Sequence, residues 1–159
     1  MPPADNTLKI EPDLILTDLE VADRWEAIDR LSELMLKKKY VTNEYASKTK
    51  EREEGFPTAL PTEPVGVAIP HTWAEICLEP AVAVGFLKKP IPWLEMGTKD
   101  KLRDVQIVLL LSITEPEKQV HFLKVIIDYF VKPENIANLL NNNGVNTIQE
   151  ALEKGLNIE

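Results

Sequence analysis

The sequence contains only two histidines, and these are the first residues to consider for chemistry. His71 follows Pro70 at the end of the apolar run Val65–Ile69. Proline fixes its own φ and lacks an N–H group, so it ends a strand rigidly. A side chain at the end of such a strand is well placed to project into a crevice. His71 is therefore a candidate functional residue; a partly buried histidine bonded to a backbone carbonyl is the alternative.

His121 lies in a second setting, a segment with helical periodicity. At helical spacing its neighbours are Glu117, Lys124 and Asp128, so it belongs to the polar side of that helix or to its edge. By itself this position is typical of a solvent-facing histidine. Both histidines follow strands that are adjacent in an α/β arrangement, so the two imidazoles could converge.

Three chemistries use imidazoles in this way. A zinc site needs three or four ligands, and the sequence has neither a His-Glu-x-x-His pattern nor a cysteine pair, so we expect no metal. Cysteine catalysis would use Cys77, but Glu75 and apolar neighbours raise the pKa of a thiol, which favours an inert packing role. The third chemistry is attack by a neutral imidazole on a phosphoryl group, with a second imidazole or an arginine bonding its oxygens. The inventory of residues fits this third chemistry.

The composition narrows the class of protein. Eighteen Lys and Arg against 26 Asp and Glu give a formal charge of −8, which argues against a nucleic-acid partner. No apolar run approaches the roughly 20 residues of a membrane-spanning helix, and the start of the chain lacks the pattern of a signal peptide. We therefore expect a cytoplasmic protein with no direct membrane insertion.

The histidines must be positioned by alternating strands and helices. Residues 14–16, 65–69, 81–87 and 105–111 read as strands, with 105–111 the clearest central strand and 91–96 a short edge strand. Helices are expected over 23–39, 43–54 and 134–140, and the patterns Thr114–Glu117 and Thr147–Glu150 resemble capping boxes that open two more. A further such pattern, Thr17–Glu20, resembles a helix start. The fold class is α/β: a single-domain sandwich with a mixed parallel and antiparallel sheet flanked by helices. Residues 1–12 are predicted to form a loose amino-terminal arm, and 13–159 the domain.

Several short motifs around the two histidines and Arg52 resemble those of a known protein family. The segment Val67–His71 resembles the phosphorylation-site motif of enzyme IIA of the sugar phosphotransferase system, of the fructose–mannitol type. Arg52-Glu53 and Pro57-Thr58 are similar to that family's Arg-Glu and Pro-Thr elements, and His121-Phe122-Leu123 resembles its second histidine. The resemblance runs from about residue 14 to 152. The sequence Phe56-Pro57-Thr58 is most similar to the galactitol-type branch of the family.

The resemblance implies a phosphotransferase that works as a relay. The histidine phosphocarrier HPr would donate, His71 would accept on Nε2, and a cysteine of the cognate enzyme IIB would receive the phosphoryl group for sugar uptake. His121 and Arg52 would offset the charge of roughly −2 that the phosphoryl group brings, and Arg52 suits bidentate contact with it. No organic cofactor or nucleotide is implied, since the sequence has no Gly-x-x-x-x-Gly-Lys loop.

Two other functions stay open. The chain could be a regulatory protein of the same fold, whose histidine phosphorylation controls a binding partner. It could also be a ligand-binding module without chemistry. We further predict that at least one of Phe56 and Trp73 rims the site of His71 and contacts HPr or enzyme IIB, because transfer between two proteins needs an apolar patch that excludes water.

Overall fold

A five-stranded mixed sheet forms the centre of the protein. The computed structural model describes residues 8–141 and 144–157. The strand order is β1-β4-β5-β3-β2. The strands pair parallel at β1/β4 and β3/β5 and antiparallel at β4/β5 and β2/β3. Their bounds are Ile15–Leu19 for β1, Ala59–Leu60 for β2, Gly66–Ala68 for β3, Ala81–Leu94 for β4 and Leu102–Ser112 for β5. The expected mixed α/β sandwich is confirmed.

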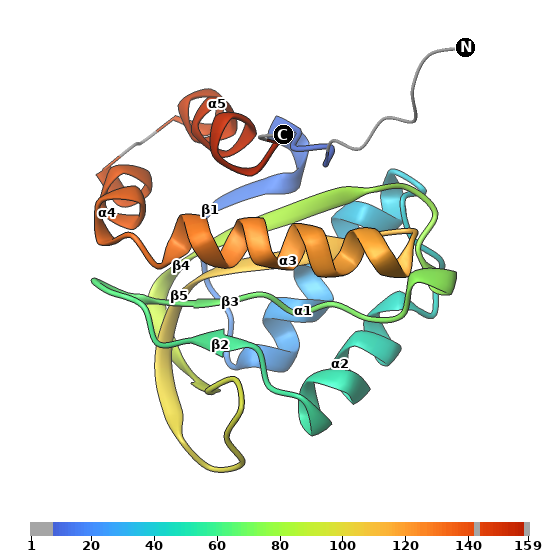
Figure 1. The fold of residues 1–159 in the computed structure, drawn as a ribbon, viewed down its shortest axis with the longest axis horizontal. Helices are drawn as coiled ribbons and strands as arrows, with labels where there is room; N and C mark the ends of the chain where they lie inside the picture. The colour runs from blue at the N-terminus through green and yellow to red at the C-terminus, as the bar shows by residue number, and fades with distance from the viewer. Residues whose placement is uncertain (1–7, 142–143, 158–159) are drawn as a thin grey trace.

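Helices cover both faces of this sheet (Figure 1). One face carries α1 and α2, and the other carries α3, which runs across the sheet in the view of Figure 1, with α4 and α5 beside it. The helix bounds are Arg24–Lys37 for α1, Tyr45–Gly55 for α2, Pro116–Phe130 for α3, Pro133–Asn141 for α4 and Val145–Leu156 for α5, with short 3₁₀ turns at Pro12–Leu14 and Ala74–Ile76. No helix in the described part of the chain is long and apolar enough to cross a membrane.

The central strand β5 shows why both faces need helices. Ile107, Leu109 and Leu111 belong to the core on the α3 side, whereas Val108 and Leu110 belong to the core on the α1 side. All five side chains are completely buried. Side chains alternate between the two faces of a strand, so a continuous apolar run fills two cores at once. This confirms the prediction of a central strand at 105–111.

The amino-terminal segment corrects the expectation of a loose arm over residues 1–12. Residues 1–7 lie outside the described residues, but residues 8–12 are packed. Leu8 and Ile10 are buried in the core on the α3 side, and Lys9 forms a parallel β-bridge with Ala81. The side chain of Asn157 bonds both backbone groups of Leu8. Residues 8–12 are therefore part of the packed structure, because apolar burial outweighs the extended local character of the prolines.

Several local predictions also need correction. The strand expected at 81–87 and the edge strand expected at 91–96 are one strand, β4, whose register against β5 shifts between Phe86 and Ile91. Residues 17–19 continue β1 instead of opening a helix. The caps of α3 and α5 are Glu115 and Gly144, neither with a side-chain cap hydrogen bond, so Thr114 and Thr147 do not form the expected capping boxes.

Candidate functional site

The loop after β3 holds His71 rigidly. The backbone N–H of Leu111 in β5 donates to the carbonyl of Pro70 at 3.1 Å, which ties the loop to the central strand. The Nδ1 atom of His71 lies 2.9 Å from the carbonyl oxygen of Ile69. A carbonyl oxygen only accepts hydrogen bonds, so Nδ1 carries the proton and donates. In the neutral ring, Nε2 is then the nitrogen with the lone pair.

The surroundings of His71 favour the neutral ring. The side chain is buried, with 7% of its surface exposed. Burial lowers the pKa of His71 below its usual value; the hydrogen bond to Ile69 opposes this, and the positive charge of Arg52 lowers the pKa further. The imidazole is therefore unprotonated at neutral pH, the state in which Nε2 is a nucleophile.

Arg52, in the last turn of α2, lines the same pocket as His71. Its guanidinium carbon lies 5.4 Å from the ring centre of Phe56 and 5.8 Å from that of Trp73, within the range of cation–π contacts. Both aromatic side chains are exposed, Phe56 by 68% and Trp73 by 41%. Full burial of both would have contradicted the predicted rim. The role of these rings in partner contact stays a prediction.

A buried carboxylate fixes the turn that follows Arg52. Glu53 accepts hydrogen bonds from the backbone N–H of Thr58 at 2.7 Å, from the Thr58 hydroxyl at 2.7 Å and from the indole N–H of Trp93 at 2.8 Å. Burial raises the pKa of Glu53, and these hydrogen bonds oppose the rise. The Arg-Glu and Pro-Thr elements of the sequence are thus joined physically: the glutamate holds the threonine, and the turn between them carries Phe56. Sequence reasoning did not assign this role to Glu53.

The residues of the site line a pocket of about 410 Å³. Among the described residues that line it are two cations, Arg52 and Lys99, and no carboxylate. In a chain of net charge −8 this local excess of positive charge suits an anion. The lining comes from the end of α2 and its turn, from the turn between β4 and β5, and from His71 and α3: Arg52, Gly55, Phe56, Pro57, Thr58, His71, Met96, Gly97, Thr98, Lys99 and Leu123.

His121 is not among these lining residues, and the convergence of the two histidines stays a prediction. Its side chain is exposed, and its ring meets that of Phe122 edge-on at 5.5 Å. Successive helical residues are about 100° apart, so His121 lies about 200° around α3 from Leu123, which does line the pocket. Leu123 and Gln119 are four residues apart and share one face. The Nε2 atom of Gln119 donates to the carbonyl of Thr72 at 2.8 Å. Sequence analysis overlooked Gln119 because a glutamine carries no charge or nucleophile; its i, i+4 spacing from Leu123 was the available signal.

Cys77, the alternative nucleophile, lies in a setting that favours a structural role. Cys77 is buried, its thiol lies 3.7 Å from the carbonyl of Trp73, and burial raises its pKa. Such a thiol is poorly nucleophilic. Within residues 8–141 and 144–157, no group of three or more His, Cys, Asp or Glu side chains could hold a metal ion.

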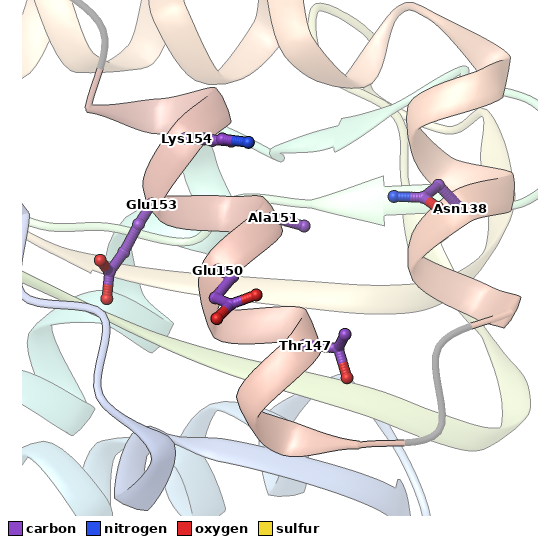
Figure 2. A pocket seen from close by; sticks show the side chains of 6 residues that line it. All are labelled: Asn138, Thr147, Glu150, Ala151, Glu153 and Lys154. Atoms are coloured by element: carbon purple, nitrogen blue, oxygen red, sulfur yellow. The ribbon is translucent and has the colours of Figure 1, made fainter.

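A larger hollow, of about 840 Å³, lies between α4 and α5 (Figure 2). Asn138 lines it from α4, and Thr147, Ala151 and Lys154 line it from α5. Its side chains include no imidazole or thiol, and none of them lines the His71 pocket. The smaller pocket is therefore the candidate functional site, because it combines a nucleophile with two cations.

The sequence matches the model of a known protein family. The model of the family described as "Phosphoenolpyruvate-dependent sugar phosphotransferase system, EIIA 2" matches residues 9–155, nearly the whole chain.

The chain is similar to a transcriptional regulator and to solved enzyme IIA structures. The transcriptional regulator ManR of Bacillus subtilis is 32% identical over 82 residues, which are 52% of this chain and only 12% of that regulator. The crystal structure of IIA mannitol from Escherichia coli has a TM-score of 0.75 at 21% identity, covering 91% of this chain and 99% of that one. The complex of enzyme IIAMTL and phosphorylated enzyme IIBMTL, also from Escherichia coli, has a TM-score of 0.74 at 20% identity, covering 92% and 99%. At these identities the two structures establish the fold.

Proposed function

Because the chain belongs to the EIIA 2 family of the phosphoenolpyruvate-dependent sugar phosphotransferase system, we propose that it is a cytoplasmic phosphoryl carrier with His71 as the acceptor. The donor is the phosphorylated histidine of HPr, and the recipient is a cysteine of enzyme IIB. The solved complex of a similar fold with phosphorylated enzyme IIB supports the second partner.

The proposed transfer consists of two displacements at phosphorus. In the first, the lone pair on Nε2 of His71 attacks the phosphorus of phospho-HPr, a P–N bond forms on His71, and the P–N bond on HPr breaks with its electron pair returning to the HPr imidazole. In the second, a cysteine thiolate of enzyme IIB attacks the same phosphorus. A P–S bond forms, and the electron pair of the breaking P–N bond returns to Nε2 of His71. No oxidant, metal or nucleotide is required for this balance.

The observation that carries the proposal is the 2.9 Å contact between Nδ1 of His71 and the Ile69 carbonyl, from which the tautomer follows. Its Nδ1–H donates to the Ile69 carbonyl, which leaves the Nε2 lone pair as the nucleophile in a pocket that also contains Arg52. Burial and the nearby cation keep the ring neutral before attack. After transfer, the same cation and Lys99 face a phosphoryl group of roughly −2 charge. Preorganised positive charge of this kind stabilises phosphoryl transfer in the transition state.

The exposed rings of Phe56 and Trp73 supply the docking surface in this proposal. Both rings lie within cation–π range of Arg52, and Phe56 lines the pocket, so a partner that covers them would also exclude water from the phosphoryl group. Aromatic residues at the centre of an interface commonly dominate its binding energy.

A regulatory role is the second candidate, and the match to ManR favours it. In that case His71 would still be phosphorylated, but the phosphoryl group would alter binding to a partner and would not pass to enzyme IIB. We also propose that the protein belongs to the galactitol-type branch, because it contains the motif Phe56-Pro57-Thr58.

The test is a reconstituted relay with labelled phosphoenolpyruvate, enzyme I and HPr. We expect the wild type to acquire acid-labile phosphate and His71→Ala to acquire none. Label on His71→Ala at the wild-type level would overturn the assignment. Addition of the cognate enzyme IIB then separates the two roles: a carrier loses its label to enzyme IIB, whereas a regulatory protein retains it.

A further inference from the structure

One side chain of α3 reaches the histidine loop, and it is a neutral amide. The Nε2 atom of Gln119 donates to the carbonyl oxygen of Thr72, the residue next to His71, at 2.8 Å. Gln119 lies in the first turns of α3, only three residues after Pro116, where the helix begins. The contact joins two segments that are 47 residues apart in the sequence.

This contact completes the immobilisation of the loop. On the amino-terminal side of His71, the carbonyl of Pro70 accepts from Leu111, and the ring itself donates to Ile69. On the carboxyl-terminal side, the carbonyl of Thr72 accepts from Gln119. The backbone carbonyls of the residues before and after His71 are thus held by different elements, β5 and α3.

The bond is costly to lose because it lies in a buried region. Thr72 is 1% exposed. A buried carbonyl without its partner is unfavourable, so the loop would rearrange to find another donor. A displacement of about 1 Å at a reacting atom can cost about 100-fold in rate.

The same face of α3 points at the pocket. Leu123, four residues after Gln119, lines the pocket with His71, whereas His121 is exposed on the other side of the helix.

We propose that Gln119 is a positioning residue for phosphoryl transfer: by holding the Thr72 carbonyl it fixes the direction of the His71 ring. This inference rests on the proposed function of His71 and adds a residue to it. Gln119 is assigned no contact with the phosphoryl group.

The experiment measures the rate constant of labelling in single turnovers over a range of phospho-HPr concentrations. Gln119→Met keeps the length of the side chain and removes the donor. Gln119→Asn keeps the amide but is one methylene too short to reach the carbonyl. Lys124→Met, an exposed position on the same helix, is the matched control. Melting temperatures establish which variants are folded.

We expect both Gln119 variants to lower the saturating rate constant about 10- to 100-fold, with little change in the half-saturating concentration and no change in Lys124→Met. That pattern indicates a lost geometry in the transition state rather than lost docking. If one variant fails to fold, the other decides.

Three results would overturn the inference: wild-type rate constants in the folded Gln119 variants, an effect confined to the half-saturating concentration, or a loss in His121→Ala without a loss in the Gln119 variants. Failure of the proposed function looks different, because the wild type itself would then acquire no label on His71.

Discussion

The buried carboxylate of Glu53 offers a sharp test of how the site is built. Its two oxygens accept three hydrogen bonds, two from Thr58 and one from the indole of Trp93. Thr58 is 4% exposed and Trp93 is completely buried. Glu53→Ala would therefore leave the Thr58 N–H and the Trp93 indole N–H without an acceptor, away from water.

The magnitude follows from those two groups. Each unsatisfied buried donor costs roughly 1–3 kcal/mol. Relief of the carboxylate's own desolvation, the main cause of its raised pKa, offsets part of this cost. We expect Glu53→Ala to lower the free energy of unfolding by about 2–4 kcal/mol, which for a chain of this size lowers the melting temperature by roughly 4–16 °C.

Glu53→Gln should behave differently from Glu53→Ala. The amide oxygen can replace Oε2, which accepts from both N–H groups, and the amide nitrogen can donate to the Thr58 hydroxyl, which also accepts. We expect Glu53→Gln to remain within about 1 kcal/mol of the wild type. The exposed neighbour provides the control, since Glu54→Ala should change little. Urea and thermal unfolding measure all three variants. Equal destabilisation by Glu53→Ala and Glu53→Gln, or none by Glu53→Ala, would refute this reasoning.

Three further predictions concern the histidine, the rim and the strand before the site. The pKa of His71 is lowered, so the labelling rate should stay constant down to the usual histidine pKa of about 6.5 and decline only below it; Arg52→Gln should move that decline to higher pH in a pH–rate profile, and a decline already above pH 7 in the wild type would contradict this. Phe56→Ser combined with Trp73→Ser should raise the half-saturating concentration of phospho-HPr about 10-fold or more while leaving the melting temperature nearly unchanged, because both rings are exposed; unchanged kinetics would exclude the docking role. Gly66→Ala should destabilise the protein by about 1–3 kcal/mol, because a Cβ there would lie 2.6 Å from a backbone oxygen of β5; equal unfolding free energies would show that β3 shifts freely.

Much of the fold could be predicted in segments where the hydrophobic periodicity of the sequence matches the burial of the side chains. The run 105–111 reads as a strand buried on both faces, and β5 is that strand at the centre of the sheet. The helix expected over 23–39 is a second example. Its apolar residues Ile28, Leu31 and Met35 share one face of α1 and are all buried. The position of His71 just after a strand was also predictable, because a proline directly before a histidine at a strand end leaves few conformations for the loop.

Other features depended on tertiary contacts that local patterns do not contain. The burial of Leu8 and Ile10 depends on β4 and α5, which pack against the segment from far along the chain. Thr114 and Thr147 have the spacing of capping boxes, but packing placed the helix starts one residue after Glu115 and Gly144.

The second histidine shows the limit of residue types as a guide to a site. His121 has the suitable chemistry, yet its position on α3 turns it to solvent. Gln119 has no reactive group, yet its position brings it to the loop of His71. A difference of two residues on a helix is about 200°, so a small error in register exchanges the inner face for the outer one.

In the proposed relay Nε2 of His71 accepts the phosphoryl group, so the decisive measurement identifies the nitrogen that bonds to phosphorus. ¹⁵N NMR of the phosphorylated protein, with labelled histidine, distinguishes the two ring nitrogens of His71 and of His121. Because Nδ1 is occupied by its hydrogen bond to Ile69, we expect a phosphorus coupling at Nε2 of His71 and a protonated Nδ1. Phosphorus on Nδ1 of His71, or on either nitrogen of His121, would contradict this expectation.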